Sequence, residues 1–414
     1  MSMKQTQTKL FDFSDVGLDF CAGSKNLFPD RFKKMLSLGY NVQTVTNVSV
    51  AGDQVTFTYG GAHGYVADRV LKVDSGALAP INGGEFWIDS VTTNTVTFTL
   101  DDAPNSISSG FTTRIASLGW SLEYEHANVH IYKFKDLAEK NLYIRLVFQD
   151  NLSHRNAIIA CIGKTADLNT GVLTDNMWPE KYRTALTPDA DLYRWEFTAI
   201  ANATHNNAGY TPAQFGKGLI VGSMHHFISM HNSGYNTGTS CKGVICGVLP
   251  TSPSVYDELD YPALLVTSLS PNTSSGPINT DVKGASYFLL GQYFCSIQAS
   301  AGTWGGLYTL IPNAANSFLP VQLDQFQTTT AEILALYEAT TKQHVGYIAG
   351  GLYQAKYGST NAPPREQALT PSYTYDINLN SLCLVHPIGN RGDTNTNVAY
   401  FVAPIEELKI GYIN

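Results

Sequence analysis

Two short segments of nearly identical sequence constrain the fold of this chain more than any other feature. Val-Thr-Phe-Thr occurs at 55–58 and again at 96–99, and each copy alternates large apolar side chains with threonine. A period of two is typical of a β-strand that has one buried face and one solvent-exposed face. Polar turn residues precede both copies, so we expect them to be two strands of one compact β module.

The same alternation recurs about every ten residues from 46 to 115, which is the spacing of a small β-sandwich or barrel. It predicts five or six short strands, separated by turns such as Asp74-Ser75-Gly76 and Asn82-Gly83-Gly84. Asn and Gly suit these turns because they tolerate positive φ values. We therefore expect a small β module over 46–115, with nothing in it that resembles a catalytic motif.

From 116 to 414 the sequence predicts a larger antiparallel β-sandwich region, which could consist of two subdomains divided near 268–284. The clearest element is an antiparallel hairpin, because 129–134 and 142–148 both alternate and a polar turn joins them. Stretches rich in Ser, Pro, Asn and Gly at 268–284 and 358–372 predict long loops. Strands that follow strands argue against a doubly wound α/β fold. Further strands are expected at 157–162, 193–198, 219–230, 244–248, 263–266, 287–294, 307–311, 382–386 and 398–402.

Helices are expected at only two places, so the predicted fold class is mainly β with one or two helices. Apolar side chains at helical spacing lie between Pro29 and Gly39, which suit the two ends of a short helix. A capping-box pattern and apolar residues on one face predict a second helix over 329–342. The first helix belongs to an N-terminal arm, 1–45, which could be a loosely held end or could dock on a neighbouring subunit.

Composition narrows the functional classes. Only 14% of the residues are charged and the net charge is −8, with no basic stripe, which argues against direct nucleic-acid binding. No run approaches the ~18 apolar residues of a membrane-spanning helix, so we expect no membrane insertion. Residues 1–9 are polar and do not resemble a signal peptide, and dispersed cysteines suggest buried thiols in a reducing cytoplasm. The six cysteines are Cys21, Cys161, Cys241, Cys246, Cys295 and Cys383.

The histidine-rich segment 224–231 is the most metal-like feature of the chain. In a strand, His225 and His231 would lie on one face, and Cys241 and Cys246 follow nearby. A zinc site usually requires three or four ligands from at least two elements, and these cysteines are spaced more widely than a usual pair. Strand histidines in a polar or interface environment explain the pattern better, so we predict no metal ligand.

Paired carboxylates for glycoside hydrolysis must be brought close together by the fold, and the sequence offers only generic candidates. These are Glu123 with Glu125, and Asp189 with Asp191. No nucleophile elbow, phosphate-binding glycine loop or Cys–His arrangement of recognisable form is present in the sequence. We predict no catalytic or cofactor-binding residue, no cofactor and no enzymatic activity.

Other features have simpler explanations than ligand binding. The acidic run 257–260 lacks the glycine-spaced oxygen ligands of a calcium loop and is expected to be a solvated loop. The triplet Arg391-Gly392-Asp393 lies in a Gly- and Asn-rich stretch that is typical of a plain turn. Aromatic residues could stack on sugars if exposed, although core or interface packing is their commoner role. The aromatic candidates are Trp178, Tyr235, Tyr293 and Trp304.

One ordered set of motifs resembles a small β domain of tailed-bacteriophage virion proteins. The set consists of Tyr59-Gly60-Gly61-Ala62-His63-Gly64-Tyr65, then Ile81-Asn82-Gly83-Gly84-Glu85-Phe86-Trp87-Ile88, then Val96-Thr97-Phe98-Thr99. In those proteins a Gly- and His-containing turn, an Asn-Gly turn into an aromatic strand and a Thr-Phe-Thr strand occur in the same order. Gly119-Trp120 and the hairpin after it also resemble the way such a domain leads into a larger β region. The likeness covers 46–150.

The resemblance implies a non-enzymatic structural component of the virion, from the tail, neck or baseplate region, with a small immunoglobulin-like module near its N-terminus. Such a subunit would be made in the bacterial host cytoplasm and assemble as a homo-oligomer about a symmetry axis, in contact with other virion structural proteins. Two alternatives stay open at this point. The large β region could bind a receptor or a host surface glycan as part of a fibre or decoration protein, or the chain could be a glycan-degrading depolymerase.

Overall fold

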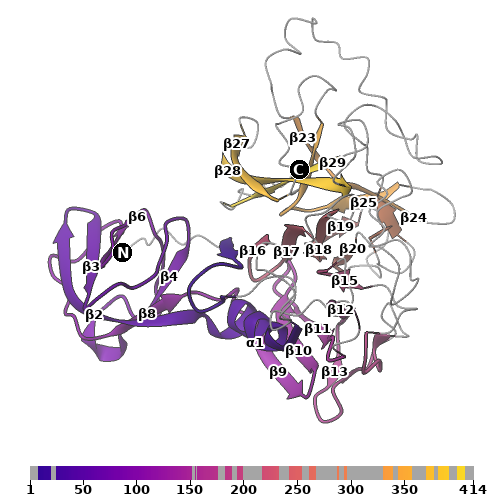
Figure 1. Cartoon of the computed structure of the whole chain (residues 1–414), viewed down its shortest axis with the longest axis horizontal. Coiled ribbons are helices and arrows are strands. Elements are labelled where there is room, and N and C mark those ends of the chain that lie inside the picture. Colours follow the sequence, from indigo (N-terminus) through magenta and orange to yellow (C-terminus); the bar gives the residue numbers. More distant parts are fainter. Residues whose placement is uncertain are drawn as a thin grey trace, which may run out of the picture.

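The structure is a computed structural model of the whole chain. It describes residues 8–19, 25–151, 154, 156–175, 182–188, 194–198, 217–232, 242–253, 261–266, 287–288, 293–295, 330–338, 344–356, 370–376, 381–390 and 399–405. Within these residues the chain is mainly β, with several antiparallel sheets and one α-helix, as the sequence predicts (Figure 1).

A short helix near the N-terminus confirms the first predicted helix. A 3₁₀ turn, η1 (Lys25–Leu27), leads into α1 (Phe28–Lys33), and a π-helical turn, η2 (Lys34–Leu38), continues it. Pro29 lies in the first turn, where its missing N–H has no intrahelical partner to lose. Gly39 follows the helix at a φ of 76°, a conformation that glycine adopts without a Cβ clash. The buried helix face packs on aromatic rings of the large β region, namely Phe148, Phe197 and Phe227.

The β module, described without gaps, is one antiparallel sheet with the strand order β5-β4-β8-β2-β3-β7-β6. The two Val-Thr-Phe-Thr copies pair directly, with Val55 opposite Phe98 and Phe57 opposite Val96. Their apolar residues are buried and their threonines only partly so, which confirms the predicted alternation. The elements are β2 (Tyr40–Ala51), β3 (Gln54–Tyr59), β4 (Val70–Asp74), the 3₁₀ turn η3 (Gly76–Leu78), β5 (Glu85–Trp87), β6 (Ser90–Val91), β7 (Thr95–Thr99) and β8 (Thr112–Ile115).

Aromatic rings fill the inside of this module. Phe98 contacts Phe57 edge to face, with 4.9 Å between ring centroids, and stacks on Phe86 at 4.5 Å. The Asn82 side-chain oxygen accepts the backbone N–H groups of Ser75 and Gly76, at 2.9 and 2.7 Å. The predicted Asn-Gly turn is therefore fixed to the turn that precedes it.

His63 fixes the connection between β3 and β4. It is buried, its Nε2 donates to the Thr95 carbonyl oxygen at 3.1 Å, and its Nδ1 accepts the Tyr65 N–H at 2.9 Å. Both ring nitrogens are thus used inside the module, so the Gly- and His-containing turn has one defined path.

The predicted hairpin is confirmed and forms the centre of a sheet with the order β15-β12-β11-β10-β9. Every residue of β12 is buried, so this strand is a continuous apolar run and not an alternation. One face of the sheet packs on the helix and the central strands, and the segment that contains β13 and β14 covers the other. The strands are β9 (Ser121–His126), β10 (Val129–Lys135), β11 (Asn141–Phe148), β12 (Ala157–Gly163), β13 (Ala166–Asp167), β14 (Val172–Leu173) and β15 (Trp195–Glu196).

The largest sheet has eleven described strands in two halves, which meet between β18 and β28. The first half is β1 (Lys9–Asp12), β16 (Gly218–Gly222), β17 (Phe227–Asn232), β18 (Lys242–Leu249), β20 (Ala263–Val266) and β21 (Tyr287–Phe288). The second is β23 (Thr330–Ile333), β26 (Tyr353–Lys356), β27 (Ser372–Asp376), β28 (Ser381–Asn390) and β29 (Ala399–Pro404). Strands β16 and β17 are buried on both faces: Ile220 and Phe227 lie in one core, Val221 and Ile228 in another.

Most predicted strands are present, with two differences in detail. The stretches 219–230 and 287–294 each contribute two strands where one was expected, and in the first a turn at Ser223–His226 separates β16 from β17. The predicted strand 307–311 and the predicted loop 268–284 lie outside the described residues, as does most of the loop 358–372.

The second predicted helix is wrong. The described part of 329–342 forms β23 and β24 (Ala335–Glu338), which pair with strands of two different sheets. Leu334 and Leu336 are buried whereas Ile333 is 51% exposed, so the side chains alternate. Long-range pairing has overridden the local helix pattern here. The sheet that contains β24 has the order β19-β25-β24-β22, with β19 (Thr251–Pro253), β22 (Tyr293–Cys295) and β25 (His344–Ile348).

Part of the N-terminal arm forms a strand of the largest sheet. β1 pairs antiparallel with β16 of the same chain, with Lys9 opposite Gly222. Leu10 and Phe11 are fully buried, one in each of two cores. Pairing with β16 and apolar burial within the chain therefore hold residues 8–19 in place.

Candidate functional site

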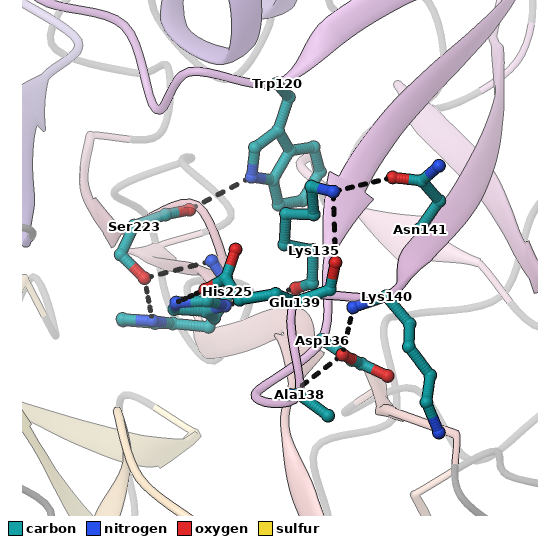
Figure 2. Close-up of polar contacts among 10 residues, drawn as sticks. Trp120, Lys135, Asp136, Ala138, Glu139, Lys140, Asn141, Ser223 and His225 are labelled. Atoms are coloured by element: carbon teal, nitrogen blue, oxygen red, sulfur yellow. Dashed lines mark hydrogen bonds and ion pairs between the residues drawn. The ribbon is translucent and has the colours of Figure 1, made fainter.

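The turn between β16 and β17 contains the arrangement closest to a nucleophile–base pair. Ser223 Oγ lies 2.8 Å from His226 Nδ1, and the His225 backbone N–H donates to the same hydroxyl oxygen at 3.1 Å (Figure 2). The Ser223 N–H also donates to the His226 carbonyl oxygen at 2.9 Å, which closes the turn. An adjacent serine and histidine could in principle act as nucleophile and general base.

The surroundings of this pair are those of a structural contact. Ser223 is only 2% exposed, so a substrate could not reach its hydroxyl without local opening. His226 Nε2 is buried and, among the described residues, has no hydrogen-bond partner that would orient the ring as a base. Burial, with a smaller effect of His225, lowers the pKa of His226 to about 4. A neutral ring accepting from Ser223 therefore stabilises the turn.

The Ser223 turn also joins two other elements of the fold. The Trp120 indole Nε1–H donates to the Ser223 carbonyl oxygen at 3.0 Å, as Figure 2 shows. On the other side, the Lys135 backbone N–H donates to the Met224 carbonyl oxygen at 3.2 Å. His225 Nδ1 donates to the Lys135 carbonyl oxygen at 3.3 Å. This small loop thus fixes the entry to β9 and the end of β10.

The turn between β10 and β11 is ordered by its own polar groups (Figure 2). The Asp136 carboxylate accepts the backbone N–H groups of Ala138 and Lys140 at 2.9 and 2.7 Å. Glu139 is exposed and its carboxylate lies 3.8 Å from His225 Nε2, an ion pair only when the imidazole is protonated. The polar residues in Figure 2 therefore connect two turns of the fold.

The predicted metal candidates are not brought together. His225 lies in the turn, whereas His231 is buried in β17, where Nδ1 contacts Ser229 Oγ at 3.0 Å and Nε2 donates to the Glu196 carbonyl oxygen at 2.9 Å. Burial lowers the pKa of His231 to about 4. The described part of the chain contains no group of three or more His, Cys, Asp or Glu residues placed to hold a metal ion.

The cysteines that can be assessed are buried, as predicted. Cys161, Cys246 and Cys383 are at most 1% exposed. Burial raises the pKa of the Cys161 thiol to about 12, so this group is protonated at neutral pH. Cys21 and Cys241 lie outside the described residues, and for Cys295 only the backbone is described.

The two carboxylates of β9 are each held by a lysine. Glu123 pairs with Lys133 at 2.5 Å, and Glu125 pairs with Lys33 of α1 at 2.7 Å. A hydrogen bond and the charge of Glu123 raise the pKa of Lys133, with burial opposing weakly. These side chains link β9 to its neighbours, so the pair does not form the facing carboxylates of a glycosidase.

Several predicted candidates fall outside the described residues. For Tyr293, in β22, only the backbone is described. The others are Trp178, Asp189, Asp191, Tyr235, Cys241, the acidic run 257–260, Trp304 and Arg391-Gly392-Asp393.

Sequence reasoning missed a buried ion pair that joins the arm to the module. Arg69 Nε and Nη2 donate to the two carboxylate oxygens of Asp15 at 2.8 and 3.0 Å, and the Tyr40 hydroxyl donates to the same carboxylate at 2.7 Å. Burial opposes the charge of Arg69, but Asp15 outweighs it and raises the pKa of the guanidinium. The signal in the sequence that could have indicated this ion pair was a lone arginine directly before the apolar strand β4.

Comparisons with known proteins identify no relative. Among the described residues, no helix is long and apolar enough to cross a membrane. No family model matches the chain, no curated protein matches it, and no solved structure matches it.

Proposed function

We propose that this chain is a non-enzymatic structural component of a tailed-bacteriophage virion, from the tail, neck or baseplate region, and assembles in several copies through subunit contacts. The observation that supports the proposal is that the potentially reactive side chains make structural contacts. In the described residues, the Ser223 turn and the β9 carboxylates hold strands and turns of the fold together. An active site would instead present such groups to a substrate.

The motifs that resemble phage virion proteins are residues that determine the shape of the module. His63 fixes the connection from β3 to β4, and Asn82 fixes the turn before β5. Phe98, from the second Val-Thr-Phe-Thr copy, lies at the centre of the aromatic core. The likeness thus involves residues that specify a fold, which supports a related structural role for the module.

Analysis of purified particles tests this proposal. Particles from a host that carries the gene are purified, analysed by mass spectrometry and labelled with antibodies against the chain. We expect label at one fixed place on the tail, neck or baseplate, and deletion of the gene to change morphology or abolish infectivity. Complementation with the intact gene is the control. Particles that lack the protein, or a deletion that changes neither property, would contradict the proposal.

An exposed aromatic residue favours a second candidate function, binding of a host glycan. Tyr347, on β25, is 45% exposed, and its ring lies beside that of His344 with 4.6 Å between centroids. An amphipathic ring of this kind can pack on the apolar face of a sugar. A glycan array with the full chain tests it: Tyr347→Ala should remove any signal, and Leu78→Ala, at another exposed apolar site, should not. No signal from the wild-type chain would eliminate this candidate.

A further inference from the structure

The two halves of the eleven-stranded sheet are joined by a ladder of only two residue pairs. β18 and β28 pair only at Lys242 with Asn390 and at Gly243 with Gly389. By contrast, β17 pairs with β18 over the whole length of β17. The contact between the halves, which we call the seam, therefore has few backbone hydrogen bonds to hold it.

The residues after this ladder explain why it stops. Pro387 of β28 has no N–H to donate, so it cannot continue the ladder. Its carbonyl also lies so close to Gly243 that a Cβ on that residue would come within 2.0 Å of the oxygen. The strands approach closely here without forming further backbone pairs.

A histidine side chain takes the place of the missing ladder. His386 is fully buried, and its Nε2 donates to the Val244 carbonyl oxygen of β18 at 3.0 Å. Because the hydrogen is on Nε2, Nδ1 is the unprotonated nitrogen. Nδ1 is buried and has no hydrogen-bond partner among the described residues. The neutral ring is thus a polar side-chain link across the seam, and protonation of its second nitrogen would place a positive charge at a fully buried position.

No carboxylate is available on the strands that surround this ring. The sequences of β17, β18, β28 and β29 contain no Asp or Glu, and the ionisable residues of these strands other than His386 are His231, Lys242, Cys246, Cys383 and Tyr400. Glu196 of β15 is already paired with Arg194 at 2.6 Å. On the described strands that surround the ring, a positive charge on His386 would therefore meet no counter-ion.

We propose that the seam is an acid-sensitive contact: protonation of His386 at Nδ1 separates β28 from β18 and loosens the two halves of the sheet, while the longer ladders hold. Burial, and to a smaller extent His231, lower the pKa of His386 to about 3, against opposing effects of the Val244 and His231 carbonyl groups. The open seam binds the proton more readily than the closed seam. The closed state is consequently favoured above about pH 6.5 and loses stability as the pH falls below that value.

Hydrogen exchange of the full chain at pH 7.5 and pH 5.0 tests the proposal. Protection factors remove the intrinsic pH dependence of amide exchange, so they report the open population. With a pKa of about 3 in the closed seam and about 6.5 in the open one, that population should rise about 30-fold at pH 5.0 for amides of the seam ladder, which consists of Lys242, Gly243, Gly389 and Asn390. Amides of β3 and β7 are the internal reference. Equal changes at the seam and in the reference would overturn the proposal.

Two variants assign the effect to one residue. His386→Gln keeps an N–H donor near the Nε2 position but cannot be protonated, so the 30-fold rise should disappear. His130→Gln removes another buried histidine, whose pKa burial lowers to about 4, and should leave the rise at the seam intact. A rise that persists in His386→Gln would show that another group opens the seam. If either variant fails to fold, the wild-type measurement alone decides.

Discussion

The β module and the eleven-stranded sheet differ in how far apart along the chain their paired strands lie. In the module, β3 and β7 pair across a short stretch of sequence, with Gln54 opposite Thr99. In the large sheet, β1 pairs with β16, and Lys9 lies opposite Gly222. The module alternates apolar and polar residues, whereas the central strands of the sheet are buried on both faces. Local patterning specifies the first region, and packing between distant segments specifies the second.

Removal of a central aromatic ring of the module should cause the largest loss of stability. Phe98→Ala deletes a buried side chain that contacts both Phe57 and Phe86, so we expect the free energy of unfolding to fall by about 3–5 kcal/mol. Denaturant unfolding monitored by circular dichroism measures the loss. Leu78→Ala, at a residue that is 53% exposed in the same module, is the control and should change stability by less than about 0.5 kcal/mol. A loss below about 1 kcal/mol for Phe98→Ala would contradict this core.

A substitution at the contact between the arm and the module should lower stability nearly as much. Asp15→Asn leaves the buried Arg69 guanidinium without its carboxylate, and we expect a loss of about 3 kcal/mol in the free energy of unfolding. Urea unfolding of the single variant and of Asp15→Asn with Arg69→Met measures the coupling. The double variant should recover part of the loss, because no unpaired charge then remains buried. Simple additivity of the two substitutions would show that the ion pair is not the cause.

An added methyl group should lower stability at the seam and should be tolerated at a glycine that has open space around it. Gly243→Ala places a methyl group against the Pro387 carbonyl, so we expect a loss of about 1–3 kcal/mol, with exchange increased in β28 and not in β3. Gly350→Ala is the matched control, because a Cβ there meets nothing within 4 Å. Thermal unfolding and hydrogen exchange report the two effects. Equal stability and equal exchange in the two variants would mean that the strands leave room for a methyl group at Gly243.

The smallest effect is expected where charges meet at the surface. Glu125→Gln removes the ion pair with Lys33, but the carboxylate is 43% exposed, so solvent screens the interaction. We expect a loss below about 1 kcal/mol, smaller still at high salt. Unfolding at low and high ionic strength checks both points. A larger, salt-independent loss would indicate that β9 needs this contact in order to pack on the helix.

The strands that could be predicted from sequence are those whose pattern is visible locally. The paired Val-Thr-Phe-Thr segments and the hairpin of β10 and β11 alternate regularly and have clear turns. The helix expected at 329–342 failed because a capping pattern and spaced apolar residues describe only local preference, while β23 and β24 pair with strands of other segments. The pairing of the arm with β16 could not be predicted for the same reason, since nothing in 8–19 indicates that partner.

The polar contacts were harder to predict than the strands. The sequence drew attention to His225 and His231, but the fold separates them. His386, which lies alone in an apolar strand, carries the contact across the seam. An isolated polar residue in an apolar run was the only available signal, and its partner is a backbone carbonyl, which has no sequence signature.

The pairing of β1 with β16 has a consequence for synthesis on the ribosome. The partners are about 210 residues apart, and bacterial and eukaryotic ribosomes add about 5–20 residues per second, so the first strand waits on the order of 10–40 s for its partner to be made. During that interval Leu10 lacks the core that later encloses it, and Phe11 lacks the part of its core that β16 and β17 supply. The β module can complete its own pairing within the same period, so the nascent chain carries a finished domain next to an exposed apolar strand that chaperones would recognise.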